Sequence, residues 1–243
     1  MEPLRVLVTG AHGRMGRAVQ RVVAESPDLV LAGAVDQGDD PWAVADVGVV
    51  VDFTTPEATL GYARFAAERG VPMVAGTTGL TPAQKGELTQ LATHVPILLA
   101  PNMSVGVNVL LDVVARAVAA LGPGWDAEVV ELHHRHKVDA PSGTALRLAE
   151  AVAQARDASL VDVGRYERRG LIGERPAGEI GVQTLRGGDV VGEHTVYLLG
   201  DSERIELTHR ATDRAIFAHG ALRAARWVIG KPAALYSMAD VLG

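Results

Sequence analysis

The stretch LRVLVTGAHGRMG, residues 4–16, decides the fold of this chain. A short apolar, β-branched run leads into glycines spaced G-x-x-G-x-x-G, and a helical pattern follows at once. Glycines permit a tight turn and a close approach of the backbone to a pyrophosphate, while the unpaired amides and the dipole of a helix N-terminus favour an anion. The alternative is a glycine-rich turn that only packs the helix on the strand. We favour the first interpretation and predict a dinucleotide-binding loop.

An acidic residue supports this interpretation. Asp36 falls twenty positions after Gly16, at the end of the second predicted strand, where a carboxylate can accept hydrogen bonds from the adenine ribose hydroxyls. The alternative is a solvated residue at a strand end. Gln37 follows, with no arginine at hand to neutralise a 2′-phosphate, so the sequence predicts NADH to be at least as suitable as NADPH.

The remainder of residues 4–100 alternates short apolar runs with longer helical patterns, which is typical of βαβ units. Strands are predicted near 4–9, 30–35, 47–53, 71–75 and 97–100, and helices near 13–25, 56–69 and 82–93. The sequence therefore predicts an α/β fold with a Rossmann-type, doubly wound parallel sheet.

Two further loops follow strands of this sheet. One is Gly76-Thr77-Thr78-Gly79 and the other is Ala100-Pro101-Asn102-Met103. The carboxyl ends of parallel strands form the edge where ligands bind, so a nicotinamide carboxamide could bond there. Ordinary turn chemistry explains the same residues equally well.

The pattern changes after Ser104. One long apolar helix is predicted to Leu121, followed by a strand at 127–132, a helix at 144–155, strands at 181–185, 190–199 and 204–208, and a last helix at 214–229. We predict a dinucleotide-binding domain from residues 1–103 and 214–243. Residues 104–213 should form a second, α+β domain with an open, mainly antiparallel sheet, which we expect to need cover from another subunit.

Composition excludes several classes of function. The chain of 243 residues contains no cysteine, which rules out a disulfide framework, a thiolate nucleophile and cysteine-ligated metals. A net charge of −6 argues against nucleic-acid binding, and the absence of a signal pattern or a long apolar run predicts a cytoplasmic protein without a membrane partner. Residues 165–175 carry four arginines interrupted by glutamates, which we interpret as a solvated loop rather than a polyanion site.

The most unusual stretch is ELHHRHKVDAPSGTAL, residues 131–146, which holds three of the eight histidines within four positions. If the strand continues through it, His133 and His134 project to opposite sides and His136 shares a side with His134. Ser142 and Thr144 then open a helix. They can act as caps, and the amides of the same turn can also form an anion site.

Three chemical interpretations of this stretch are open. A metal site could use its histidines with Glu131 and Asp139, but the spacing fits no zinc pattern and Arg135 and Lys137 would repel a cation. A basic patch for an acidic partner is the second. We favour the third, acid–base and anion-binding chemistry, because histidine titrates near neutral pH and a positioned ammonium suits proton donation. No metal is predicted.

Together these motifs resemble the 4-hydroxy-tetrahydrodipicolinate (dihydrodipicolinate) reductase family of the diaminopimelate and lysine pathway. Residues 131–146 closely match its signature, and residues 10–16, 52–54, 76–79, 100–108 and 238–242 match its pattern in the same order. The similarity covers essentially the whole chain. The main departure is Gln37, where many members carry arginine, and this puts a strong NADPH preference in doubt.

The resemblance implies a homotetramer that reduces a small dicarboxylate, 4-hydroxy-tetrahydrodipicolinate, to tetrahydrodipicolinate with NADH or NADPH and loss of water. Residues 104–213 would bind substrate and oligomerise. His133 would be the proton donor or acceptor and Lys137 a proton donor, while the substrate carboxylate would be held by His134, Ser142, Gly143 and Thr144. The residues implied to line the cofactor are Gly10, Ala11, His12, Gly13, Arg14, Met15, Asp36, Gly76, Thr77, Thr78, Ala100, Pro101, Asn102 and Met103.

Two rival functions stay open from the sequence. A non-catalytic redox sensor would bind dinucleotide without turnover, although it would not require the histidine–lysine stretch. A reductase of another small carboxylate would share every motif described. For catalysis the two domains must close over both ligands, so we expect hinges near Met103 and Arg214.

Overall fold

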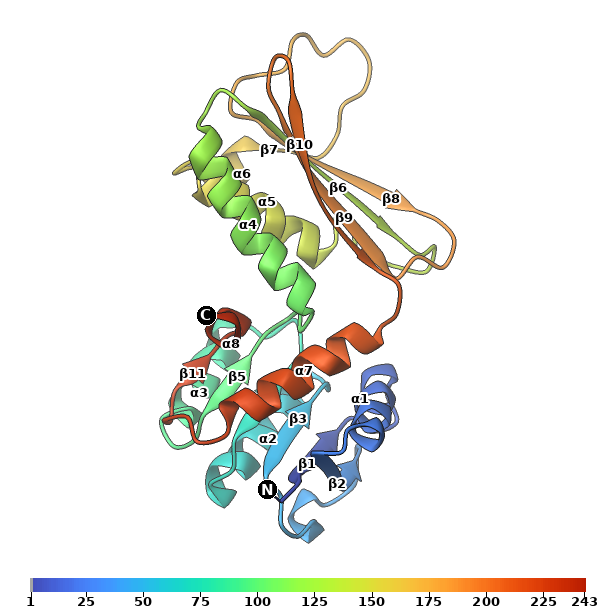
Figure 1. Ribbon diagram of the computed structural model, residues 1–243, viewed down its shortest axis with the longest axis vertical. Coiled ribbons are helices and arrows are strands. Elements are labelled where there is room, and N and C mark those ends of the chain that lie inside the picture. Colours follow the sequence, from blue (N-terminus) through green and yellow to red (C-terminus); the bar gives the residue numbers. More distant parts are fainter. Residues whose placement is uncertain (1) are drawn as a thin grey trace. The chain divides into compact units, whose positions relative to one another are not determined.

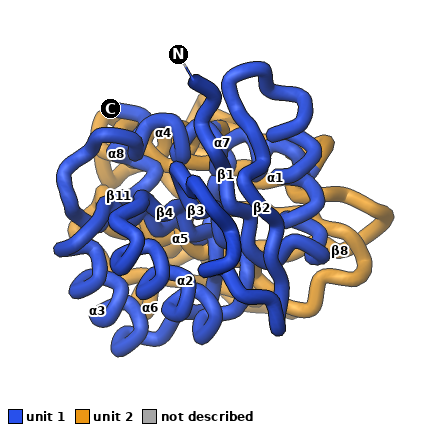
Figure 2. The backbone as a smooth tube through the Cα atoms, turned by 90° about the horizontal axis from the view of Figure 1, so that it is seen from below, with its two compact units in different colours: residues 1–105, 214–243 blue, residues 106–213 orange. Residues whose placement is uncertain are grey.

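The computed structural model describes residues 2–243 and divides the chain into two compact units. Unit 1 comprises residues 1–105 and 214–243, and unit 2 comprises residues 106–213 (Figure 2). Among the described residues, none of the helices combines the length and apolar character needed to cross a bilayer.

Unit 1 is built on a parallel sheet with helices on both faces (Figure 1). Its elements are β1 (Leu4–Thr9), α1 (Arg14–Glu25), β2 (Leu29–Val35), the 3-10 turn η1 (Pro41–Ala43), β3 (Val49–Asp52), α2 (Pro56–Arg69), β4 (Met73–Ala75), α3 (Pro82–Leu91), β5 (Ile97–Leu99), α7 (Ala215–Val228), β11 (Leu235–Tyr236) and α8 (Met238–Leu242).

The strand order β11-β5-β4-β3-β1-β2 locates the ligand-binding edge of unit 1. All neighbouring strands pair in parallel, and β2 lies on one side of β1 while β3, β4 and β5 lie on the other. In such open sheets the crevice for a ligand forms at the carboxyl ends of the strands where the order reverses. Here that point lies between the loop after β1 and the residues after β3.

Alternating residues of β1 show why the sheet is covered twice. Val6 and Val8 pack with α1 and α7, whereas Leu7 packs with α2 and α3. Successive side chains of a strand point to opposite faces, so an unbroken apolar run fits a strand buried on both sides. The sequence prediction of a doubly wound sheet is confirmed.

Threonine caps set the starts of α2 and α3. The Thr55 hydroxyl accepts a hydrogen bond from the Ala58 amide, and Thr81 forms a capping box with Gln84. In both helices a proline follows the cap, where its missing N–H costs nothing. The helix starts predicted near residues 56 and 82 are confirmed.

Unit 2 places α4 and α5 on one face of a second sheet (Figure 1). Its elements are α4 (Val105–Leu121), β6 (Asp126–His133), α5 (Gly143–Gln154), α6 (Leu160–Val163), β7 (Gly164–Arg165), β8 (Ile180–Arg186), β9 (Gly192–Leu199) and β10 (Arg204–Ala211). The strand order is β10-β9-β6-β8-β7.

This second sheet is mainly antiparallel, as the sequence predicts, with parallel pairs toward the β7 edge. β9 pairs antiparallel with β6 and β10, but β8 pairs parallel with β6 and β7. The chain leaves β6 and returns to β8 through a crossover that contains α5 and α6, and such a connection produces a parallel pair. β9 and β10 are joined by a tight turn at Gly200, whose amide donates to the Glu203 carbonyl.

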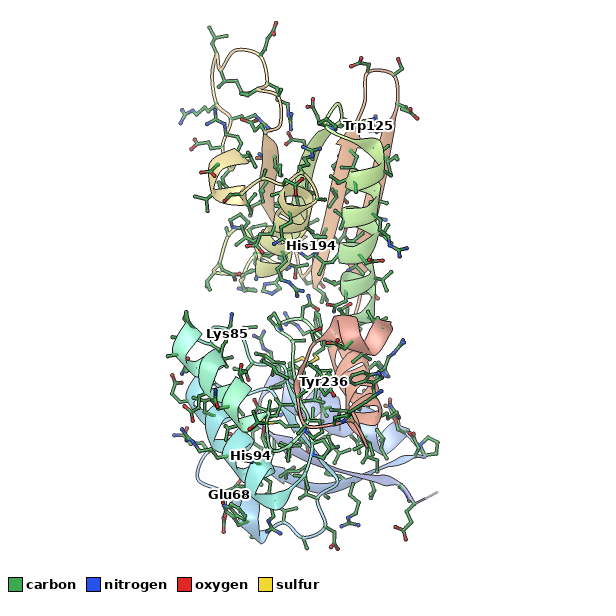
Figure 3. All side chains as sticks on the ribbon, turned by 90° about the vertical axis from the view of Figure 1, so that its left-hand side faces the viewer. Glu68, Lys85, His94, Trp125, His194 and Tyr236 are labelled. Carbon is green, nitrogen blue, oxygen red and sulfur yellow. The ribbon has the colours of Figure 1, made fainter. Side chains whose placement is uncertain are left out.

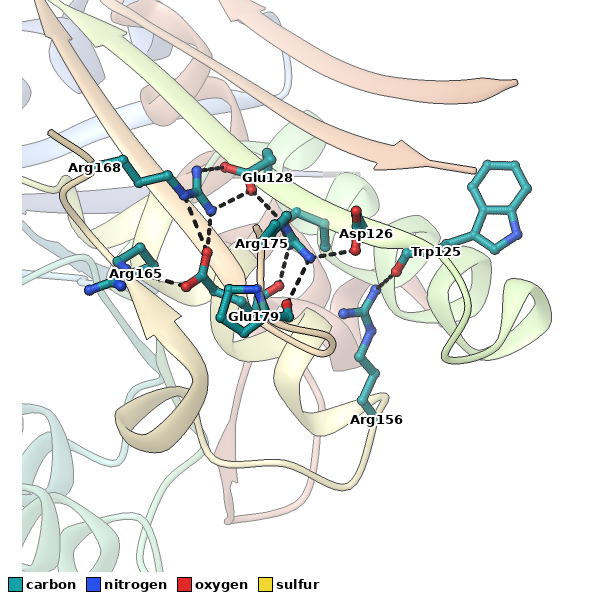
Figure 4. A network of polar contacts seen from close by, with 10 residues as sticks. Trp125, Asp126, Glu128, Arg156, Arg165, Arg168, Arg175 and Glu179 are labelled. Atoms are coloured by element: carbon teal, nitrogen blue, oxygen red, sulfur yellow. Dashed lines mark hydrogen bonds and ion pairs between the residues drawn. The ribbon is translucent and has the colours of Figure 1, made fainter. Parts of the chain in front are cut away.

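The arginine-containing loop of unit 2 is only partly solvated (Figure 4). Arg168 binds both oxygens of Glu128 at 2.8 and 2.7 Å and also contacts Glu179, and these partners raise the pKa of Arg168. Arg175 joins the same network through Glu128 and Asp126. The expectation of a solvated loop is therefore wrong for these two arginines. Acidic side chains on β6 and just before β8, distant in sequence, recruit them.

Candidate active site

The loop after β1 has the shape of a dinucleotide site. Gly10 has a φ of +69°, and a Cβ on Gly16 would lie 2.1 Å from the Gly10 carbonyl oxygen, so both positions require glycine. Gly13 precedes α1 and offers no side-chain cap. By contrast, α2, α3 and α5 are each capped by a hydroxyl, whereas the N-cap of α7, Arg214, makes no side-chain cap hydrogen bond. The first amides of α1 are thus left for an external anion such as a pyrophosphate.

Asp36 closes the other end of this loop. Its carboxylate accepts hydrogen bonds from the His12 amide at 2.7 Å and from the Gln37 amide at 2.8 Å. These backbone bonds lower the pKa of Asp36, so the group is a carboxylate at neutral pH. Ionised and partly exposed at the end of β2, it is suited to accept ribose hydroxyls.

The remaining residues predicted to line the cofactor differ in exposure. Ala11, Thr77, Ala100 and Met103 are buried. Gly76 has a different constraint, because a Cβ there would lie 2.1 Å from the Phe53 ring. Exposed or partly exposed positions among the predicted set are His12, Gly13, Arg14, Met15, Thr78, Pro101 and Asn102.

Asp52 lies at the end of β3 and is hydrogen-bonded to several segments at this edge of the sheet. It is fully buried and accepts four hydroxyls, from Thr9 (2.6 Å), Thr54 (2.7 Å), Thr59 (2.6 Å) and Thr77 (2.9 Å). These donors come from the end of β1, the loop after β3, helix α2 and the loop after β4. One carboxylate therefore ties together the loops predicted to hold the cofactor.

In unit 2, β6 brings Glu131 and His133 to the covered face of the sheet. Burial alternates along β6, and both residues occupy its buried positions. The two side chains meet, with His133 Nδ1 2.5 Å from Glu131 Oε2. The strand predicted at 127–132 ends at His133, so the alternation that a longer strand would give to His134 and His136 does not apply. The chain turns after it, where the Lys137 amide donates to the His134 carbonyl.

Glu131 is the centre of a larger network. Arg186 from β8 grips both of its oxygens at 2.8 and 2.9 Å, the Thr184 hydroxyl donates at 3.1 Å, and the Ser142 amide donates at 3.0 Å. Burial acts to raise the pKa of Glu131, but hydrogen bonds from His133, Arg186 and Ser142 prevail and lower it to about 2. The carboxylate stays ionised at neutral pH.

His194 on β9 adjoins this network and was not predicted from the sequence (Figure 3). It pairs directly with Glu131 across the sheet, its Nε2 lies 3.0 Å from the Ser142 hydroxyl, and its ring is edge-on to His133 with centroids 5.1 Å apart. Burial, and secondarily His133, lowers the pKa of His194 to about 3. His194 is therefore neutral and acts as a hydrogen-bonding partner.

The other predicted residues of the stretch surround this pair. Lys137 Nζ donates to both oxygens of Asp139 at 2.8 Å, and its hydrogen bond lowers the pKa of that carboxyl. His134 is half-buried, with its ring 6.2 Å from that of His136. Gly143 is exposed and Thr144 half-buried in the first turn of α5, where the helix dipole favours an anion.

The geometry also bears on the metal interpretation. Arg186 occupies both oxygens of Glu131, and Lys137 occupies both oxygens of Asp139. Within residues 2–243, no three histidine or acidic side chains come together as a group that could hold a metal ion.

Comparison with known families covers nearly the whole chain. Residues 4–103 match the family described as dihydrodipicolinate reductase, N-terminus, and residues 106–242 match dihydrodipicolinate reductase, C-terminus. The chain belongs to the dihydrodipicolinate reductase family. The resemblance inferred from the sequence is confirmed, and membership makes the protein an NAD(P)H-dependent oxidoreductase.

Relatives of this reductase family are similar over their full length. The chain is 48% identical to the 4-hydroxy-tetrahydrodipicolinate reductase of Anaeromyxobacter dehalogenans, covering 98% of this chain and 97% of the relative. It is 53% identical to the protein of the same name from Nitratidesulfovibrio vulgaris, covering 98% of both.

Solved structures share the fold. A dipicolinate-bound dihydrodipicolinate reductase from Paenisporosarcina sp. matches with a TM-score of 0.77 at 24% identity, over 97% of both chains. GenD2 from gentamicin A biosynthesis, solved in complex with NAD, matches with a TM-score of 0.58 at 15% identity, over 94% of this chain and 86% of that one. At these identities the likeness shows the fold alone.

Sequence reasoning missed three residues of this reductase. Glu131 was considered only as a metal ligand, although its i, i+2 spacing to His133 could have placed both on one face of a strand. Asp52 was detectable as a lone charge that ends the all-valine run of β3. His194 carried no local signal, because only the pairing of β9 with β6 brings it to the site.

Proposed function

We propose that this chain reduces 4-hydroxy-tetrahydrodipicolinate to tetrahydrodipicolinate with NADH or NADPH and with loss of water, in diaminopimelate and lysine biosynthesis. The observation that carries the proposal is the buried Glu131–His133 pair beside the N-terminus of α5. It combines a proton-transferring imidazole with an anion-binding helix end, which are the functions that reduction of an anionic ring requires.

In this mechanism the nicotinamide supplies the hydride, and the chain's residues supply protons and hold the substrate. The overall reaction takes up one hydride and one proton and releases water, so an acid must lie against the ring. His133 fills this role through Nε2, because Nδ1 faces Glu131. Lys137 lies four residues after His133 in the sequence. It is a second proton donor to the substrate ring.

The substrate carboxylate would be held by His134, Gly143 and Thr144. Ser142 contributes differently, since its hydroxyl already accepts from the Ala145 amide and faces His194. We assign to Ser142 the shaping of the turn that presents the following amides. We propose that residues 104–213 bind the substrate and also form the contacts of a homotetramer. Residues 1–103 and 214–243 would bind the dinucleotide.

The cofactor would lie along the loop after β1, with its pyrophosphate on α1 and its adenine ribose on Asp36. Residues 76–78 and 100–103 would approach the nicotinamide. We propose that NADH serves at least as well as NADPH, because Asp36 is ionised and Gln37 offers no charge to a 2′-phosphate. The Gln37→Arg variant should raise the NADPH-to-NADH ratio of kcat/KM by roughly three- to tenfold.

The deciding experiment follows nicotinamide oxidation by absorbance, with freshly prepared 4-hydroxy-tetrahydrodipicolinate and either cofactor. Substrate-dependent oxidation is expected with both. Cofactor binding without oxidation would overturn the proposal in favour of a sensor or of another carboxylate substrate.

A further inference from the structure

Glu131 has more partners than charge neutralisation requires. Arg186 already matches the carboxylate with two hydrogen bonds, which is the favoured geometry of an arginine–carboxylate pair. Even so, His133 Nδ1 lies 2.5 Å from Glu131 Oε2. Glu131 is fully buried, so solvent does not compete for its contact with His133, and the orientation of the two groups is fixed.

The protonation pattern of the pair follows from what each atom can do. An ionised carboxylate only accepts hydrogen bonds, so the His133 nitrogen that faces it must carry a proton. A neutral imidazole has one N–H, and Nε2 of His133 is then left with its lone pair. In the imidazolium form Nε2 carries the second proton and becomes the acid.

The surroundings leave room at the second nitrogen. A Cβ on Gly192 would lie 2.9 Å from His133 Nε2, so only glycine at this position of β9 leaves that atom its present space. The His133 side chain is 11% exposed, against 0% for Glu131. The pair is therefore oriented, with its carboxylate inside the unit and the imidazole toward its surface.

We infer that Glu131 is a positioning residue, which locks His133 in the Nδ1–H tautomer and directs Nε2 toward the substrate. The inference rests on the proposed function for its catalytic consequence, but the tautomer itself is a property of the free protein. The structure gives Glu131 a second task through its bond to the Ser142 amide, because one carboxylate thereby fixes both the imidazole and the start of α5.

Charged and titratable groups face this pair from each neighbouring element. Arg186 comes from β8, His194 from β9 and His209 from β10, while Lys137 and Asp139 belong to the loop after β6. Arg186 offsets the charge of Glu131, so the carboxylate acts on His133 mainly by direction. Burial holds His194 neutral, and burial also lowers the pKa of His209, so neither adds a fixed charge.

The test is Glu131→Gln in the full-length protein. The amide oxygen should take the Oε1 position, which receives the Ser142, Thr184 and Arg186 donors. The NH₂ then faces His133 as a donor, which favours the opposite tautomer with Nδ1 as acceptor. Nitrogen NMR of the His133 imidazole, recorded without substrate, should show Nδ1–H in the wild type and a shift toward Nε2–H in the variant. The kcat should fall roughly a hundred- to ten-thousandfold, with an unchanged dissociation constant for NADH and an altered pH profile of kcat.

Glu128→Gln is the matched control. It removes a carboxylate from the same strand and breaks a two-bond arginine pair, to Arg168, without contacting His133. Its turnover should stay within about twofold of the wild type. A wild-type His133 in the Nε2–H form overturns the inference even if Glu131→Gln does not fold, as does a folded Glu131→Gln variant with wild-type tautomer and kcat. A wild type with Nδ1–H but no turnover of 4-hydroxy-tetrahydrodipicolinate would instead defeat the proposed function alone.

Discussion

Asp52 in unit 1 and Glu131 in unit 2 are both fully buried carboxylates at or near the end of a strand, yet they are stabilised in different ways. Four threonine hydroxyls surround Asp52. A guanidinium, an imidazole, a hydroxyl and an amide surround Glu131. A buried carboxylate must be satisfied in either case, because an unpaired one carries a large desolvation cost.

The different hydrogen-bond donors indicate different roles for the two carboxylates. Hydroxyl donors do not titrate near neutral pH, so the Asp52 group is a fixed anchor that joins the loops at the ligand edge of unit 1. The group around Glu131 contains the His133 imidazole, which can exchange a proton. Burial holds this imidazole in one orientation, which suits it to proton transfer. Loss of Asp52 should therefore act on stability and cofactor affinity, and loss of the Glu131 group on turnover.

The largest effect is expected from His133→Gln. Removing the imidazole should lower kcat roughly a hundred- to ten-thousandfold, because the proposed proton donor that Glu131 orients is lost. Cofactor affinity, measured by quenching of nucleotide fluorescence, should be unchanged, since the proposed cofactor site lies in unit 1. A variant with wild-type turnover would show that proton transfer does not pass through His133.

Asp52→Asn tests the other side of the comparison. It should lower the free energy of unfolding by about 2–4 kcal/mol, because four hydrogen bonds lose their charged acceptor. Denaturant titration checks this value, and NADH affinity should fall in parallel. Asp28→Asn is the control: it breaks an exposed pair with Arg226 and should shift the midpoint far less. Equal shifts in both variants would contradict the anchoring role.

Acidification should destabilise the folded protein through the group of residues around Glu131. The folded pKa values of His194 (about 3) and Glu131 (about 2) lie below the ordinary values of 6.5 and 4.5. In both cases the unfolded chain binds protons more readily, so their contribution to stability is complete above the ordinary pKa and is lost as the pH falls toward the folded one. Between about pH 6 and pH 4, the His194 contribution to the free energy of unfolding should fall by about 1.4 kcal/mol per pH unit.

Denaturant titrations across this pH range provide the measurement. The His194→Gln variant should show a flatter dependence, because the buried titrating group is gone. The matched change at an exposed histidine, His94→Gln, should leave the slope as in the wild type. If both variants keep the wild-type slope, His194 is not the group that responds.

The smallest effect is expected from Gly192→Ala. The added Cβ would press on His133 Nε2, and a displaced imidazole should reduce kcat roughly tenfold with little change in NADH affinity. Gly187→Ala is the matched control, since a Cβ there meets no atom within 4 Å. Equal kcat values for the two variants would show that the space at Nε2 does not matter.

Much of the fold was predictable because its signals are local. The loop after β1, the threonine–proline starts of α2 and α3 and the Gly200 turn each depend on residues close in sequence. The arginine loop was predicted wrongly for Arg168, because its partner Glu128 lies forty positions away. The parallel pairing of β8 within the mainly antiparallel second sheet was not specified for the same reason, since neither strand alone encodes its partner.

The glycine-rich loop, the parallel sheet and the family could all be inferred without a structure, since each rests on motifs that the chain carries as continuous segments. Only the tertiary structure decided how the buried carboxylates are used. Strand register brought Thr184 and His194 beside Glu131 and set Arg186 opposite His133. The physical reason is that a strand's own alternation fixes which residues share a face, whereas the pairing of strands decides what those residues meet.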